Sequence, residues 1–320
     1  MRFADPVTEN LVVRLTSLSS ANLLPSPANR FVSERERFLV FSSDRTGAYA
    51  PFRLDLRNGT VHQLAETAKL DPRSLTMDEG ERSLFLLDSG ALKEAPLTNK
   101  GGSRTIAEDV TGFAMGRDAT DLLLVRQGRL EDVNKNVVAT DVTGTCLLRP
   151  GGKACLIERG SRAGTEFWYA PMGDSERKLI LLAQGRVSFP FWAPDGNSIL
   201  FLREVPHGEA TLSEIHEVLI DNVMEQPVSS TSQFAAFSPN RDASVFVGSS
   251  RSKAQPNIVL LLRSAKREMT LCEHHASDAA AVGPVFAPDS RRVYFESDRE
   301  GKPALYSVNV ELLVEPTQTG

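Results

Sequence analysis

A short sequence phrase recurs seven times along this chain and constrains its fold more than any other feature. In each copy an aromatic or apolar residue precedes a polar turn, and a strand ending in an apolar residue follows. The clearest copies are residues 191–196 (FWAPDG) before 199–201 (ILF), and 286–290 (FAPDS) before 293–295 (VYF). Because each unit of such a repeat is one supersecondary element, its period identifies the architecture.

The period is that of a four-stranded propeller blade. The copies align on the last apolar residue of their second strand, and the steps between them are 44, 39, 33, 44, 45 and 49 residues. Propeller blades repeat every 40–50 residues, roughly. The aligned residues are Phe41, Phe85, Leu124, Ile157, Phe201, Phe246 and Phe295. The sequence therefore predicts seven blades.

Within the first unit, the pattern fits four antiparallel strands. Residues 38–41 (FLVF) form a short buried strand, and 49–56 alternate apolar and polar residues as a half-buried strand does. Asn58 and Gly59 predict a two-residue hairpin turn. Residues 61–64 are then the outer strand. Unit five departs most from the repeat, because a polar insertion lies between His207 and His216, where we expect a loop.

The last unit has no outer strand of its own, and residues 11–16 (LVVRLT) have the pattern of one. We expect this N-terminal strand to complete the seventh blade, which closes the ring and leaves no long open edge. The predicted fold is all-β: a seven-bladed β-propeller of four-stranded antiparallel blades. No linker or composition shift marks a second domain, so we expect residues 1–320 to form one propeller domain.

Charge and composition exclude several classes of partner. The chain carries 36 Lys and Arg against 41 Asp and Glu, with no long basic run, so nucleic acid is not an expected partner. No stretch approaches the ~20 apolar residues of a membrane span. No secretory signal is visible either, so we expect a cytoplasmic protein, or a periplasmic one if a signal peptide was removed. Three cysteines without a paired spacing favour neither zinc nor a disulfide framework.

Two levels of family resemblance follow from these motifs. The phrase FWAPDG, with the turns at 43–47 (SDRTG) and 297–301 (SDREG), resembles the TolB-type propeller repeat. The C-terminal part, residues 271–306, looks like the end of the oligogalacturonate lyases, which are seven-bladed propellers acting on pectin fragments. The first two units resemble that family too, through residues 43–64.

The resemblance to the lyases implies β-elimination. That chemistry needs a base, usually His, and a cation that neutralises the uronate carboxylate. The family supplies manganese held by a cluster of His and a Gln, with a further His and an Arg. In place of the closing Gln and two His, this chain has Asp278, Ala281 and Gly283. The other family positions fall near Ala235, Phe189 and Glu166, so the resemblance implies that the lyase metal and base positions are replaced.

Five residues are ligand-binding candidates at a mouth of the channel. The tandem His274 and His275 resemble the family's single His in the outer strand of unit six. They could not both bind one ion easily, because successive strand residues face opposite ways. Asp278 follows on the loop toward the channel. Arg45 and Arg299 share one position in the repeat, where they attract acidic groups or build a turn. We assign no catalytic residue and no metal ligand.

The sequence favours a binding protein over an enzyme. Our main hypothesis is a non-catalytic propeller, without a cofactor, that binds a small molecule, an oligosaccharide or a protein partner at the channel mouth. The alternative is an oligogalacturonate lyase, or a related carbohydrate-active enzyme, with a rearranged site and manganese. A rearranged site predicts that Asp278, a His and an Arg converge at one channel mouth. A protein-binding platform instead predicts an exposed apolar patch.

Overall fold

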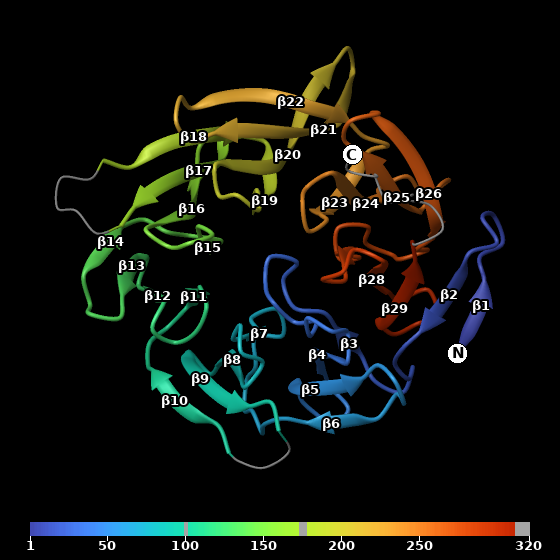
Figure 1. The fold of residues 1–320 in the computed structure, drawn as a ribbon, viewed down its shortest axis with the longest axis horizontal. Helices are drawn as coiled ribbons and strands as arrows, with labels where there is room; N and C mark the ends of the chain where they lie inside the picture. The colour runs from blue at the N-terminus through green and yellow to red at the C-terminus, as the bar shows by residue number, and fades with distance from the viewer. Residues whose placement is uncertain (99–101, 173–177, 311–320) are drawn as a thin grey trace, which may run out of the picture.

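The computed structural model describes residues 1–98, 102–172 and 178–310 of the chain. These residues form 29 strands and no helix, so none of them forms a helix long and apolar enough to cross a membrane. The strands build seven antiparallel sheets around a central channel (Figure 1). The prediction of an all-β, seven-bladed propeller is confirmed.

Blades one to three follow one another along the chain, each running from its inner strand to its outer strand. Blade one is β3 (Asn22–Leu23), β4 (Phe38–Ser43), β5 (Ala50–Asp55) and β6 (Val61–Gln63). Blade two is β7 (Thr76–Met77), β8 (Ser83–Asp88), β9 (Ala91–Pro96) and β10 (Arg104–Ala107). Blade three is β11 (Gly112–Met115), β12 (Leu122–Arg126), β13 (Arg129–Asp132) and β14 (Val137–Ala139).

Blades four to six repeat the same order. Blade four is β15 (Cys146–Leu148), β16 (Ala154–Ser161), β17 (Gly164–Pro171) and β18 (Ile180–Gly185). Blade five is β19 (Val187–Trp192), β20 (Ser198–His207), β21 (Ala210–Leu219) and β22 (Met224–Ser230). Blade six is β23 (Phe234–Pro239), β24 (Val245–Ser250), β25 (Asn257–Leu262) and β26 (Arg267–Glu273).

The N-terminus closes the ring, as the sequence predicts. Blade seven contains β27 (Val285–Phe286), β28 (Arg292–Ser297) and β29 (Ala304–Asn309), and β2 (Leu11–Arg14) pairs antiparallel with β29 (Figure 1). A fifth strand, β1 (Arg2–Ala4), pairs with β2 on its outer side. The sequence analysis did not predict β1, because three residues are too few to show a strand period.

The repeat phrase builds the core. All seven aligned residues lie in the second strand of a blade and are at most 6% exposed. Their aromatic rings pack between blades: Phe167 of blade four meets Phe201 of blade five edge-on, with ring centroids 5.7 Å apart. Burying a phenylalanine of this kind contributes about 2–3 kcal/mol relative to leaving it exposed. All three cysteines are buried as well.

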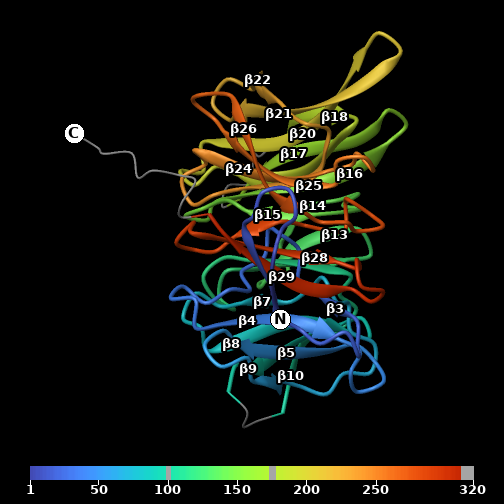
Figure 2. The same ribbon diagram turned by 90° about the vertical axis from the view of Figure 1, so that its right-hand side faces the viewer.

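Two local predictions are wrong. Asn58 and Gly59 do not form a two-residue hairpin, since β5 ends at Asp55 and β6 begins only at Val61. The Asp55 carboxylate accepts the backbone N–H groups of Arg57 and Asn58, which stabilises a longer turn. The insertion in unit five is not a loop either: β20 and β21 are ten residues each and pair along their whole length. Their hairpin projects beyond the neighbouring blades (Figure 2).

The inner strand of blade one is interrupted by an excursion into the channel. Asn22 and Leu23 pair with β4, and Val32 makes the next bridge, to Leu39. Residues 24–30 between them, the plug loop, reach toward the middle of the ring (Figure 1). The loop contacts blade two: Asn29 Nδ2 donates to the carbonyls of Arg73 (3.2 Å) and Leu75 (3.0 Å). Asn29 therefore anchors the plug loop to blade two.

Candidate functional site

All inner strands start at the same end of the channel, which we call the first end. The loops from outer to inner strands and the turns between second and third strands also lie there. The first end thus carries Asp278, on the loop between β26 and β27, and the turns with Arg45 and Arg299. The turns between first and second strands surround the opposite, second end.

A hollow of about 170 Å³ opens at the first end, between the loop after β26 and blades one and seven. We call it the first-end pocket. Its walls are mostly apolar, and four charged residues line it. The apolar lining residues are Leu23, Ala276, Ala281, Val282 and Pro303; the charged ones are Arg73, Asp278, Glu296 and Asp298.

Arg73 and Glu296 form the central ion pair of this pocket. Arg73 Nη2 donates to Glu296 Oε2 at 3.1 Å, and Nη1 contacts Oε1 more closely. Nη1 also donates to the carbonyl of Leu24, and Glu296 accepts the Leu24 N–H at 2.6 Å. The pair thus joins blades two and seven to the plug loop. Burial raises the pKa of Glu296 to about 7, although the Arg73 charge lowers it.

Two more carboxylates lie at the rim of the first-end pocket. Asp298 accepts hydrogen bonds from the N–H of Ser277, at 2.8 Å, and from the Ser277 hydroxyl. Burial alone would raise the pKa of Asp298, but these hydrogen bonds hold it below its ordinary value. Asp278 is exposed and its Oδ1 accepts only the N–H of Ala280 among the described residues, at 2.9 Å. Since Arg73 and Glu296 neutralise each other, the pocket carries net negative charge.

A larger cavity, about 320 Å³, lies between the plug loop and blades three to five. We call it the second-end cavity. The plug loop contributes Pro27, Ala28, Asn29 and Arg30, and the opposite wall is apolar and aromatic. That wall includes Phe113, Met115, Cys146, Leu148, Phe191 and Trp192. A further hollow of about 190 Å³, toward the first end, shares Asn29, Phe113 and Cys146 with it.

The two candidate histidines are placed differently. His274 is 1% exposed, and its Nδ1 accepts the N–H of Ala276, so Nε2 donates to the carbonyl of Ser250. Both ring nitrogens are therefore used by the backbone, and burial lowers the pKa of His274. His275 is exposed, has a φ of 46° and pairs with Glu273 at 2.9 Å. Neither histidine lines the described pockets, and their ligand role stays a prediction.

The two candidate arginines both donate hydrogen bonds to neighbouring protein groups. Arg45 donates to Ser43 and Asn22, and its guanidinium lies 4.7 Å from the ring centroid of Phe52. Burial lowers the pKa of Arg45. Arg299 donates to the carbonyls of His274 and Glu273. Of the five candidates, only Asp278 lines a described pocket, and no histidine is among the lining residues of that pocket.

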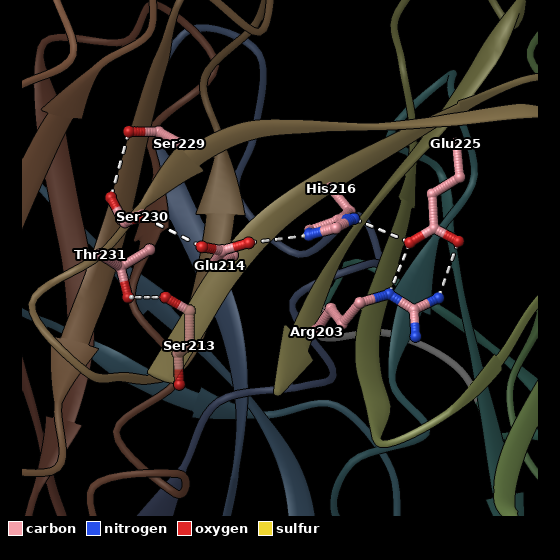
Figure 3. Close-up of polar contacts among 8 residues, drawn as sticks. All are labelled: Arg203, Ser213, Glu214, His216, Glu225, Ser229, Ser230 and Thr231. Atoms are coloured by element: carbon pink, nitrogen blue, oxygen red, sulfur yellow. Dashed lines mark hydrogen bonds and ion pairs between the residues drawn. The ribbon is translucent and has the colours of Figure 1, made fainter. Parts of the chain in front are cut away.

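A second polar cluster lies on blade five, away from the channel pockets. His216 stands between two carboxylates, with Nδ1 2.7 Å from Glu225 and Nε2 3.1 Å from Glu214 (Figure 3). Arg203 holds Glu225 through two N–H groups and also donates to the carbonyl of Gln184 in blade four. The cluster therefore ties the long hairpin to its neighbouring blade.

The donor set does not fit a catalytic metal of the kind the lyase resemblance implies. Among the described residues, no three His, Cys, Asp or Glu side chains are grouped so that they could hold an ion. Ala281 lines the first-end pocket, and Gly283, Ala235 and Phe189 have no donor atom in their side chains. Glu166 accepts the indole N–H of Trp168 at 2.9 Å.

Sequence reasoning missed Arg73, Glu296 and the plug loop. One signal for the loop was present: 14 residues separate Leu23 from Phe38, against five between Phe286 and Arg292 in the last unit, and they include Pro25 and Pro27. No local signal marks the ion pair, because its partners are 223 residues apart in the sequence.

The fold places the chain beside known propellers. An oligogalacturonate lyase from Vibrio parahaemolyticus is 19% identical, with a TM-score of 0.83, over 97% of this chain and 96% of that one. An oligogalacturonate lyase in complex with manganese is 18% identical, with a TM-score of 0.82, over 97% and 95% of the two chains. TolB from Acinetobacter baumannii has a TM-score of 0.50 at 14% identity, over 89% and 85%.

At these identities the similarity shows the propeller fold and not an activity. The scan against protein families finds no match, and the search of curated proteins finds none either.

Proposed function

We propose that this propeller binds a neutral or cationic sugar, or a polar small molecule of similar size, in the first-end pocket, without lyase chemistry. The observation that carries the proposal is the pocket itself. It places one exposed carboxylate, Asp278, beside an apolar wall at the mouth of a closed channel. Ligand sites of this kind combine an apolar lining with a few polar groups that fix orientation.

The size of the pocket supports a single ring. A protein cavity of roughly 150 Å³ admits benzene, and the first-end pocket measures about 170 Å³. Its apolar wall, formed by Ala281, Val282 and Pro303, fits the C–H face of a sugar ring. Asp278 at the rim is positioned to accept hydrogen bonds from hydroxyl or ammonium groups, since an ionised carboxylate only accepts.

The charge of the pocket argues against an anionic ligand. Asp278 and Asp298 remain negative after Arg73 and Glu296 neutralise each other. A uronate would bring further negative charge to within a few ångström of these groups, where like charges repel. The pair Arg73–Glu296 offers little compensation, because both Nη atoms already bind Glu296.

β-Elimination also lacks its usual base in this pocket. The ring nitrogens of His274 are both bonded to the backbone, and Ala281 and Gly283 stand where the lyase resemblance implies histidines. A binding function asks for none of these groups. This reasoning favours the binding hypothesis over the rearranged lyase.

Calorimetric titration with three matched oligosaccharide sets tests the proposal. The sets are neutral cello-oligosaccharides, cationic glucosamine oligomers and anionic oligogalacturonates. We expect the neutral or cationic set to bind, and Asp278→Asn to weaken the cationic set at least about fivefold, which is roughly 1 kcal/mol. Asp195→Asn is the matched control, because Asp195 likewise accepts an N–H two residues ahead but lies at the second end.

Three results would overturn the proposal. One is preferential binding of oligogalacturonate, together with unsaturated product forming at enzyme-like rates when manganese is added, which would favour the lyase. Another is equal affinity of the Asp278→Asn and Asp195→Asn variants for the cationic set. Binding only of a protein partner would also exclude a sugar site and favour a protein-interaction platform.

A further inference from the structure

We propose that the second-end cavity is a separate binding site for a small amphipathic anion, a carboxylate on an aromatic or branched apolar body. The apolar body would pack against Phe113, Phe191 and Trp192, and the carboxylate would pair with Arg30. The proposal does not depend on the function of the first-end pocket, because the two linings share no residue.

The cavity has the size and lining of a ligand site. At about 320 Å³ it falls within the range of roughly 300–1,000 Å³ that small-molecule pockets occupy. Such pockets are lined mainly by apolar and aromatic side chains, with few polar groups. Here the aromatic wall comes from blades three and five, and the polar groups Asn29, Arg30 and Thr76 come from the plug loop and blade two.

The charge of the lining selects an anion. Arg30 is the one charged residue among those that line the cavity in the described chain. Its Nη1 donates to the carbonyl of Met77 at 3.1 Å, and no described carboxylate pairs with it. A guanidinium has five N–H donors in a planar fork that matches a carboxylate. Arg30 is exposed, so a ligand can reach these donors.

The backbone of the plug loop fixes Arg30 before any ligand binds. The Arg30 N–H donates to Thr76 Oγ1 at 3.3 Å, and its carbonyl accepts the Met77 N–H at 2.7 Å. Asn29 anchors the preceding residue to the same strand. An anion would therefore meet a largely preformed site, and preformed sites lose less free energy to ordering on binding.

The aromatic wall is held as firmly. The indole N–H of Trp192 donates to the carbonyl of Leu147 at 3.1 Å, and its ring meets Tyr169 edge-on with centroids 6.3 Å apart. Trp192 is thus held in place in the cavity wall. Trp192 also provides a reporter, because the chain has only one other tryptophan, Trp168.

The experiment compares 2-naphthoate with its neutral amide, 2-naphthamide, on the full chain. Binding is measured by calorimetry and by Trp192 fluorescence in a Trp168→Phe background. We expect 2-naphthoate to bind at least about tenfold more tightly than the amide, as a charge-assisted hydrogen bond implies. Arg30→Gln should remove this preference. Arg35→Gln, an exposed arginine at the same end that does not line the cavity, should keep it.

A second variant fills the cavity with a larger side chain and leaves its charge unchanged. Ala28→Phe, at an exposed position of the plug loop, should weaken the binding of both probes. Equal affinity for acid and amide would overturn the proposal, and so would unchanged affinity in both Arg30→Gln and Ala28→Phe. Tighter 2-naphthoate binding in Asp278→Asn, with no change in Arg30→Gln, would place the probe in the first-end pocket and would also overturn the proposal.

Discussion

At the first end of the channel, Arg73 and Glu296 are bonded to each other and to the plug loop, and the Glu296 side chain is only 5% exposed. At the second end, Arg30 is exposed and its guanidinium donates to one backbone carbonyl. Both arginines line a cavity, but only Arg73 compensates a buried carboxylate. The difference separates charge that holds the ring together from charge that is available to a ligand.

The contrast has an energetic basis. In the Arg73–Glu296 pair only the glutamate is buried, since the Arg73 side chain is 41% exposed. Removal of Arg73 would leave the buried Glu296 charge without compensation. An exposed charge pays no such penalty, because water solvates it. The difference can be tested by substituting residues at each end and measuring the free energy of unfolding.

The largest effect should come from Arg73→Met. At about pH 7.5 this change leaves Glu296 buried without its partner, and we expect the free energy of unfolding to fall by about 3 kcal/mol. At about pH 5.5 the loss should be clearly smaller, since Glu296 can then take up a proton. Urea denaturation at the two pH values measures both.

The control for this variant is Arg117→Met. Arg117 pairs with Glu79 at 3.7 Å, but both side chains are more than half exposed. Its removal should change the free energy of unfolding by less than about 0.5 kcal/mol. Equal losses for Arg73→Met at both pH values would contradict the idea that Glu296 carries the penalty.

The pH dependence of stability sharpens the comparison further. Burial raises the pKa of Glu296 to about 7. Glu36 lies at the second-end rim, between blades one and seven. Burial and a hydrogen bond with Asp289 raise the pKa of Glu36 to about 7 as well. Between about pH 4.5 and 7 the native state thus binds more protons than the unfolded state, so the free energy of unfolding falls as pH rises. The fall is about 2 kcal/mol for the buried Glu296 and smaller for Glu36, whose charge solvent partly screens.

Glu296→Gln tests this expectation without removing the contacts. A glutamine resembles the protonated acid, and its single oxygen can still accept from the Leu24 N–H and Arg73 Nη1, while the bond from Arg73 Nη2 is lost. We expect the variant to match the native protein at about pH 5 and to be more stable by about 2 kcal/mol at pH 8. Chemical denaturation across this range is the measurement, and a pH profile parallel to that of the native protein would refute the raised pKa.

The fold was predictable because its signal is local and repeated. Phe41, Phe201 and Phe295 mark second strands by the same short pattern, and each copy supports the others. Closure by β2 was predictable from a missing strand in the last unit. Where a single turn depends on one capping side chain, as Asp55 does, the local pattern was insufficient.

The channel ends were not predictable, because they arise from contacts between distant residues. Arg73 and Glu296 meet only after the ring closes, and the plug loop carries no motif for the cavity it creates. Arg45 and Arg299 were predicted as ligand-binding candidates from their shared position in the repeat. In the structure both donate to neighbouring protein groups, and their ligand role stays a prediction. Asp278 was identified because it departs from the pattern of the resembling family.

Removing an anchor of the plug loop should have an intermediate effect. Asn29→Ala deletes the donor to two carbonyls, one of them from Leu75, and should lower the free energy of unfolding by about 1–2 kcal/mol. Asn136→Ala is the control: Asn136 is exposed and bonds a nearby aspartate, so its loss should cost only a few tenths of a kcal/mol by the same reasoning. Similar losses for the two would show that the loop is not anchored through Asn29.

The smallest stability effects should belong to the two groups assigned to ligands. Asp278 accepts a single described hydrogen bond, which asparagine preserves, and Arg30→Gln loses at most the bond to Met77. Each change should alter the free energy of unfolding by less than about 1 kcal/mol. Their effects on binding should oppose each other in charge, because Asp278→Asn weakens cations at the first end while Arg30→Gln weakens anions at the second. A loss of several kcal/mol in either variant would mean that its charge is structural, as at Arg73, and would remove the distinction between the two ends.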